Sequence, residues 1–235
     1  MNNKQTILLK ISGEFLKGEK TIICPTKLKN IVSQIGQLSK KYNIGIVLGG
    51  GNIIRGGMTN IPNVARTSAD QMGMLSTTIN CLALRDSLTA NGIKNKMFSL
   101  IPMPTIAHVY NINEAKRALN KGKVVIFTGG TGNPYFSTDT GIALRALENN
   151  AKTILMAKNG VDGVYSDDPR KNKKAKRLSK LTYNEIIQKN LMVMDITATQ
   201  LLKDSDVEIL VFNADETNCF IKAMNKKILF TKITK

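Results

Sequence analysis

The sequence predicts an α/β fold, with a mainly parallel central sheet between two layers of helices. Apolar runs of strand length alternate with amphipathic segments of helix length, which is the pattern of parallel strands joined by helical crossovers. Most of these runs are apolar throughout, as strands are when helices cover both faces of their sheet. These two observations predict a three-layer αβα sandwich.

The expected elements follow in chain order. Strands are predicted at the apolar runs over residues 6–11, 44–48, 96–100, 124–128, 153–157, 208–212 and 227–231. Helices are predicted at the amphipathic segments over residues 25–41, 68–91, 112–120, 138–149, 183–189, 198–204 and 216–224. Pro25 suits the first turn of a helix, because its fixed φ is helical and its missing N–H is not needed there. Thr182 and Glu185 are spaced as a capping box, in which each side chain satisfies a free amide.

Length and composition favour one globular domain over residues 1–235. Apolar residues make up 42% of the 235 positions, which is enough for a sizeable core. No apolar run approaches the ~18 residues of a membrane span, and the first ten residues carry no secretory leader, so we expect a cytoplasmic protein. Cys24, Cys81 and Cys219 lack metal-ligand spacing and indicate reduced thiols, which argues against zinc or redox chemistry.

The formal net charge of +17 has two interpretations. A basic surface attracts nucleic acid, anionic membranes or phosphorylated substrates. However, 27 of the 34 cationic residues are lysines, and aromatic residues are only 5% of the chain with no tryptophan, whereas nucleic-acid surfaces favour arginine and stacking aromatics. Compositional bias is therefore the preferred explanation. The basic segment 169–177 is either an anion-attracting rim or a solvated turn, and solvation is the usual case.

Three glycine-rich turns, each directly after an expected strand, give the strongest indication of function. They cover residues 10–14, 48–57 and 128–139. Ligands of open α/β sheets gather at the carboxyl ends of strands, and glycines let phosphate oxygens approach backbone amides. Lys10 and Arg55 are placed to bind such oxygens. The P-loop and dinucleotide fingerprints are both absent from the sequence, and the single histidine, His108, is expected to be structural.

Five motifs occur in order along the chain. They are Lys-x-Ser-Gly-Glu at 10–14, Gly-Gly-Gly-Asn-x-x-Arg-Gly at 49–56, Ala-Asp-Gln-Met-Gly-Met-Leu-Ser-Thr at 69–77, Thr-Gly-Asn-Pro-Tyr-Phe-Ser-Thr-Asp at 131–139 and Asn-Gly-Val-Asp-Gly-Val-Tyr-Ser-Asp-Asp-Pro at 159–169. Together they resemble the bacterial uridylate kinases, or UMP kinases, a branch of the amino acid kinase superfamily. The resemblance runs over nearly the whole chain. The third and fourth motifs are specific to this branch, whereas the superfamily shares the glycine turns and the first lysine.

The resemblance implies the amino acid kinase fold, as in carbamate kinase, and transfer of the γ-phosphoryl group of ATP to UMP with Mg²⁺, in pyrimidine nucleotide biosynthesis. It also implies a homohexamer. A protein can catalyse such a transfer by aligning two nucleotides and supplying cations, without a covalent intermediate. The acceptor UMP is expected in the N-terminal part of the chain, and ATP is expected mainly from about residue 151 onward.

The resemblance also assigns residues. ATP is expected to contact Lys10, Ile11, Ser12, Gly13, Gly51, Arg55, Asn159, Tyr165 and Asp168. UMP is expected to contact Gly50, Asp70, Thr131, Gly132, Asn133, Pro134, Tyr135, Phe136, Ser137 and Thr138. The expected catalytic residues are Lys10, Arg55 and Asp139.

Four of the polar residues have alternatives that the sequence leaves open. Asp70 either contacts UMP or only interacts with the dipole of its helix. Asp139 either positions Mg²⁺ or Lys10, or is an ordinary carboxylate of a first helical turn. Lys158 is a second phosphoryl-stabilising cation or an exposed side chain. Asp195 belongs to the catalytic centre or caps a helix.

Two rival functions remain at this stage. The first is a kinase of the same superfamily with another acceptor, such as carbamate, an amino acid or isopentenyl phosphate, and the 131–139 loop argues against it. The second is a basic nucleic-acid-binding protein that retains a kinase fold.

The basic segment leads to a prediction about salt. Replacing Lys171, Lys173, Lys174 and Lys176 by Gln should weaken apparent nucleotide affinity modestly at low salt, because the lysines raise the local nucleotide concentration without direct contact. The difference should fade near physiological ionic strength, where the Debye length is about 8 Å. Steady-state titrations at several salt concentrations measure this effect. A loss of turnover at every salt concentration would instead mean specific contacts.

Overall fold

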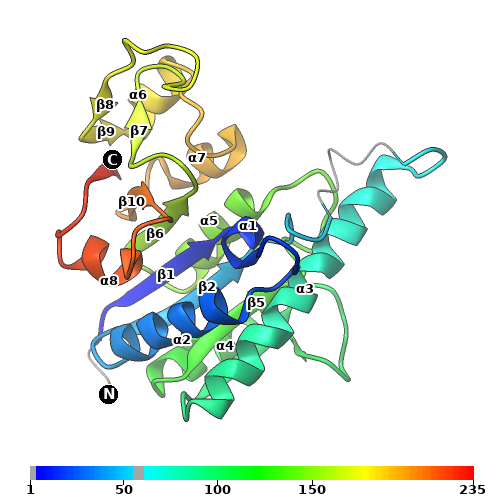
Figure 1. Cartoon of the computed structure of the whole chain (residues 1–235). Coiled ribbons are helices and arrows are strands. Elements are labelled where there is room, and N and C mark those ends of the chain that lie inside the picture. Colours follow the sequence, from blue (N-terminus) through cyan, green and yellow to red (C-terminus); the bar gives the residue numbers. More distant parts are fainter. Residues whose placement is uncertain (1–3, 55–60) are drawn as a thin grey trace.

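One sheet of nine strands organises the residues that the structure describes, 4–54 and 61–235 of this computed structural model (Figure 1). Its strand order is β4-β3-β5-β2-β1-β6-β10-β11-β9, and a separate hairpin pairs β7 with β8. The strands are β1 (Thr6–Ile11), β2 (Asn43–Leu48), β3 (Asn95–Ser99), β4 (His108–Val109), β5 (Val124–Thr128), β6 (Thr153–Lys158), β7 (Val164–Tyr165), β8 (Arg177–Leu178), β9 (Lys180–Thr182), β10 (Glu208–Asn213) and β11 (Phe230–Thr234).

Helices cover both faces of this sheet. They are α1 (Gly13–Leu16), α2 (Pro25–Ser39), α3 (Arg66–Ala90), α4 (Ile112–Asn120), α5 (Thr138–Glu148), α6 (Tyr183–Gln188), α7 (Ile196–Leu202) and α8 (Cys219–Met224). One core cluster packs α2, α3 and α8 on one face, and a second packs α4, α5, α6 and α7 on the other. Figure 1 shows α3 extending past the edge of the sheet at its N-terminal end. The predicted three-layer sandwich is confirmed.

The alternation of side chains along β1 determines the face of the sheet to which Lys10 points. Ile7, Leu9 and Ile11 belong to the core on the α2 and α3 face, whereas Leu8 belongs to the core on the α5 face. Successive side chains of a strand point to opposite faces. Lys10 therefore points to the α5 face, at the carboxyl end of a strand that pairs in parallel with both β2 and β6.

The strand β11 fastens the hairpin to the sheet. It lies between β10 and β9 and is antiparallel to β10, whereas the other strand pairs described for this sheet are parallel. The Thr231 hydroxyl accepts a hydrogen bond from the backbone N–H of Val164 at 2.7 Å and donates one to the carbonyl of Leu178. Arg177 Nη1 donates to the carbonyl of Phe230 at 3.0 Å. The β7–β8 hairpin is thus held from a strand that comes much later in the chain.

The sequence prediction was wrong for the strand at 227–231. The apolar run Ile228-Leu229-Phe230 favoured it, but the strand lies at Phe230–Thr234 and buries Thr231 and Ile233 in alternation. The preceding Lys226 has a left-handed backbone, φ +56°, which ends α8 and delays the strand. The predicted start of α7 was two residues late and that of α8 three residues early, and the short elements α1, β4 and β7 to β9 were missed. Pro25 at the start of α2 and the Thr182–Glu185 capping box are confirmed.

Buried polar side chains anchor the second glycine turn to α3. Asn52 and Asn80 form a reciprocal amide pair, with N···O distances of 3.0 and 2.7 Å. Asn80 Nδ2 also donates to the carbonyl of Gly49 at 2.8 Å, and Asn52 Nδ2 donates to the carbonyl of Ile22 at 2.8 Å. Because unpaired polar groups are costly in a protein interior, this network holds the turn after β2 in one place.

Two other sequence predictions concern His108 and the cysteines. His108 lies on the short strand β4, exposed, with its ring 5.9 Å from that of Phe98, and its structural role stays a prediction. Cys24, Cys81 and Cys219 are free thiols. Within residues 4–54 and 61–235, no helix combines the length and the apolar character needed to cross a bilayer.

Candidate active site

An ion pair joins the end of β1 to the start of α5. Lys10 Nζ lies 2.8 Å from Asp139 Oδ1, and both side chains are largely buried. Asp139 is in the first turn of α5, whose N-cap residue Ser137 accepts a hydrogen bond from the Asp139 backbone N–H at 2.9 Å. Asp139 is therefore a first-turn carboxylate of α5 that pairs with Lys10.

Lys158 is the second amine of this cluster. Lys10 pairs in register with Met156, and Lys158 lies two residues further along β6, so both lysines project from the same face of the sheet. Burial lowers the pKa of Lys158, the charge of Asp139 raises it and that of Lys10 lowers it. Burial works to raise the pKa of Asp139, but the two lysine charges hold this pKa below its ordinary value. The strands therefore bring two amines to one carboxylate.

Asp195 ties α5 to α7. Its carboxylate caps α7 by accepting the Ala198 backbone N–H at 2.7 Å. It also accepts hydrogen bonds from the Ser137 hydroxyl, and from the Thr140 backbone N–H and hydroxyl at 3.1 and 2.9 Å. Asp195 is thus a helix cap and, through the same oxygens, the residue that fixes the N-terminal turn of α5 under Asp139.

The third glycine turn and its continuation run from β5 to α5. Gly129, Gly130 and Gly132 have φ of +79°, +62° and +81°, a backbone region that suits glycine. The Thr131 hydroxyl donates to the carbonyl of Asn133 at 3.0 Å and accepts its backbone N–H at 3.2 Å. The loop is therefore shaped by its own hydrogen bonds.

The side chains of this loop face solvent at its tip. The residues expected to contact UMP, from Thr131 to Thr138, follow one another along this loop. Among them, Tyr135 and Phe136 are exposed. Asp70 on α3 lies beside them, because its Oδ2 accepts the backbone N–H of Tyr135 at 2.9 Å. Asp70 also pairs with Arg66 at 2.9 Å and lies beyond the first turn of α3, so the helix-dipole alternative does not describe it.

The first two glycine turns pack directly on each other. A Cβ at Gly13 would lie only 2.9 Å from the carbonyl of Gly49 and 2.8 Å from the N–H of Gly51. A Cβ at Gly50 would lie 2.7 Å from Ser76 Cβ on α3. These glycines are required by close backbone packing, whatever ligand they touch. Ile11 is buried in the core, Ser12 caps α1, and Arg55 lies outside the described residues.

The residues expected on the adenosine side line one cavity. Asn159, Tyr165 and Asp168 surround a volume of about 610 Å³ that also reaches Lys158. A cavity of about 400 Å³ shares Lys158 with it and is lined by Asp139 as well. The two cavities also share residues 190–193, so a path of lining residues leads from Tyr165 to the Lys10–Asp139 pair.

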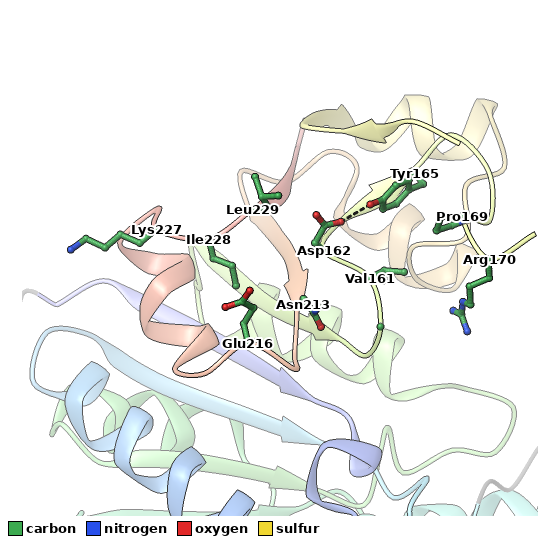
Figure 2. Close-up of a pocket in the computed structure, with 11 residues that line it drawn as sticks. Val161, Asp162, Tyr165, Pro169, Arg170, Asn213, Glu216, Lys227, Ile228 and Leu229 are labelled. Atoms are coloured by element: carbon green, nitrogen blue, oxygen red, sulfur yellow. Dashed lines mark hydrogen bonds between the residues drawn. The ribbon is translucent and has the colours of Figure 1, made fainter. Parts of the chain in front are cut away.

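A third cavity, of about 540 Å³, also borders Tyr165, and Figure 2 shows residues that line it. Tyr165 donates a hydrogen bond to Asp162 Oδ1 at 2.7 Å, drawn as a dashed line. This cavity shares Tyr165 and Arg170 with the 610 Å³ cavity but is not lined by Lys158. The 610 Å³ cavity is therefore the better placed of the two for a nucleotide whose phosphates reach Lys158.

Sequence reasoning missed several residues of this site. Lys158 was not among them: the sequence left it open between a phosphoryl-stabilising cation and an exposed side chain, and its place at the end of an apolar strand, like that of Lys10, was a usable signal. Thr140 and Arg66 gave no such signal, because their partners Asp195 and Asp70 become recognisable only once the helices are placed. The exposed Met192, between α6 and α7, was also missed, although it lines both cavities that reach Lys158.

Comparison with known proteins finds similar sequences and a similar structure over nearly the whole chain. The profile of the Amino acid kinase family matches residues 5–213. The uridylate kinase of Malacoplasma penetrans is 46% identical over 232 residues, 99% of this chain and 73% of that protein. The uridylate kinase of Mycoplasma capricolum is 44% identical over 99% of this chain and all of its own length. The crystal structure of UMP kinase from Ureaplasma parvum superposes with a TM-score of 0.95, at 42% identity, over 99% of this chain and 100% of that one.

The coupling between Asp139 and Lys158 gives a prediction with a definite sign. Asp139→Asn should lower the pKa of Lys158 further, because the carboxylate charge is what raises it against burial and Lys10. Titration of ¹³C-labelled lysine by NMR measures the change. Asp204→Asn, an exposed aspartate after α7, is the control and should leave Lys158 unchanged. An unchanged or higher pKa of Lys158 in Asp139→Asn would contradict the coupling.

The lowered pKa of Asp139 also affects the stability of the fold in acid. Because the pKa of folded Asp139 is lowered, its ionised form stabilises the fold above its pKa in the unfolded chain, about 4. This contribution should disappear as the pH falls through the lowered value.

Proposed function

This chain belongs to the amino acid kinase family, and from that premise we propose that it transfers the γ-phosphoryl group of ATP to UMP, giving ADP and UDP, in pyrimidine nucleotide biosynthesis. The observation that carries the proposal is the identity of 44% to the uridylate kinase of Mycoplasma capricolum over 99% of this chain and all of that one. The cluster of Lys10, Asp139 and Lys158 supplies the chemistry that such a reaction needs.

Phosphoryl transfer spreads negative charge over the transferred group, so catalysis depends on positioning and on nearby cations. Lys10 is the residue best placed to stabilise that group, since Asp139 fixes its ammonium at the carboxyl end of β1. Lys158 adds a second amine from the adjacent strand. No side chain needs to act as a nucleophile in this scheme.

Mg²⁺ fits the side chains of this centre. Asp139 Oδ1 is buried and, apart from the 2.8 Å contact with Lys10, no further partner reaches it within the described part of the chain. Mg²⁺ is usually held by one or two carboxylates together with substrate phosphates. Asp139 would hold the ion with the ATP phosphates, and the ion would neutralise phosphate charge there.

In this proposal, UMP and ATP bind to different parts of the chain. UMP occupies the N-terminal part, at Gly50, Asp70 and the loop 131–138. ATP occupies the turn at residues 10–13 and the 610 Å³ cavity lined by Asn159, Tyr165 and Asp168. Gly51 and Arg55 are proposed to contact ATP, and Arg55 to act in catalysis.

A panel of acceptors tests the function. With ATP and Mg²⁺, ADP formation should be fastest with UMP among UMP, CMP, AMP, GMP, carbamate and isopentenyl phosphate. Lys10→Ala should lower kcat by about a hundredfold or more, because it removes preorganised positive charge from the transferred group. Lys180→Ala, an exposed lysine of β9, is the control and should keep full turnover.

The other outcomes distinguish the rivals. ADP formed only with another acceptor would identify a kinase of different specificity in the same family. No ADP with any acceptor, together with salt-dependent retention on DNA, would favour a nucleic-acid-binding protein.

Self-association into a homohexamer is part of the proposal. Leu75 and Ile79 lie one turn apart on α3 and are 48% and 51% exposed. A chain of net charge +17 repels its copies unless an apolar contact offsets the repulsion. This exposed pair on the long helix α3 is suited to such a contact.

A cytosolic location is proposed from the three free thiols.

Sedimentation velocity tests the assembly. The native chain should sediment as a hexamer, and the double variant Leu75→Lys/Ile79→Lys should form smaller species, because charge would be buried at the contact. Leu201→Lys, at an exposed leucine of α7, should leave the hexamer intact. A native monomer would contradict the proposal, and so would a hexamer that survives the double substitution.

A further inference from the structure

We propose that Arg66 is a positioning residue for the acceptor site, holding Asp70 and Tyr135 in their binding arrangement before UMP arrives. The inference rests on the proposed function, because it treats the 131–138 loop and Asp70 as the UMP site. Arg66 is the first residue of α3 and is half exposed.

Arg66 forms an ion pair with Asp70, one helical turn away. Its Nε donates to Asp70 Oδ2 at 2.9 Å and Oδ1 at 3.0 Å. The Asp70 side chain is only 12% exposed, against 50% for Arg66. An exposed ion pair at this spacing alone contributes little to stability. This pair differs because its carboxylate has a further partner on another segment.

That further partner is the backbone of the loop. Asp70 Oδ2 accepts the N–H of Tyr135 at 2.9 Å. Tyr135 has a φ of +69°, a left-handed conformation that is unfavourable for a bulky residue. The Arg66 guanidinium carbon also lies 5.3 Å from the centre of the Tyr135 ring, within the range of a cation–π contact. Arg66 and Asp70 together hold Tyr135 in this strained conformation.

The arrangement leaves an acceptor site free for the ligand. A carboxylate has about four lone-pair positions. Within residues 4–54 and 61–235, Arg66 uses one position on each oxygen and the Tyr135 N–H uses a second on Oδ2, so Oδ1 retains one. A ribose hydroxyl can donate to Oδ1 without displacing Arg66. The cost of ordering the loop is therefore met by protein contacts rather than by the binding energy of UMP.

Three variants test this role. Arg66→Ala should raise KM for UMP by about tenfold, since it removes a charge-assisted contact and the order of the loop, and should leave KM for ATP and the melting temperature nearly unchanged. Arg66→Lys should recover part of the affinity, because it keeps the charge but lacks the planar group over the Tyr135 ring. Arg85→Ala, which breaks another exposed pair on the same helix, with Asp86, should leave KM for UMP unchanged.

Amide exchange separates this inference from the proposed function. Without nucleotides, residues 131–137 should exchange faster in Arg66→Ala than in the native chain, and at the native rate in Arg85→Ala. Unchanged exchange together with an unchanged KM for UMP would overturn the inference. A rise in both KM values with a lower melting temperature would overturn it in favour of a purely structural role. A native chain without activity on UMP would reject the proposed function, while faster exchange in Arg66→Ala would still support the bracing of Tyr135.

Discussion

The ion pair between Lys10 and Asp139 is the contact on which the arrangement of the site depends. It joins the end of a central strand to the start of the helix that packs on it. Two buried amines beside a single carboxylate form a cluster that gains from an added anion, because each amine left without a partner is costly in a protein interior. Asp195 serves this pair indirectly, since it fixes the turn of α5 that carries Asp139.

A second constraint is that backbone loops near a ligand need fixed positions. The turn after β2 is held by the amide pair of Asn52 and Asn80. The turn after β5 is held through Thr77, whose hydroxyl accepts the Gly129 N–H at 3.0 Å. Both Asn80 and Thr77 belong to the buried face of α3. One long helix therefore positions two glycine turns, and through Asp70 it also reaches the loop 131–138.

The fold was predictable because its strands are buried on both faces and so have continuous apolar sequences. The strand at 230–234 was misplaced because it alternates between buried and partly exposed residues and follows an apolar loop. Within the site, Lys10 and Asp139 were predictable from motifs at strand and helix ends. The convergence of Asp195 on Ser137 and Thr140 was not, because these residues lie more than fifty positions apart and meet only through packing of α5 on α7.

The position of β11 has a consequence for how the chain folds while it is being synthesised. Val164 and Tyr165 of the β7–β8 hairpin line the 610 Å³ cavity, yet the contact that fastens this hairpin, through Thr231, lies 53 residues after Leu178. A chain emerging from its N-terminus can complete the strands β1 to β6 early, because their partners are already synthesised. The β7–β8 hairpin must wait, because the strand that fastens it, β11, is synthesised later. The strands from β1 to β6 can thus pair first in every newly made molecule, and the β7–β8 hairpin is fastened last.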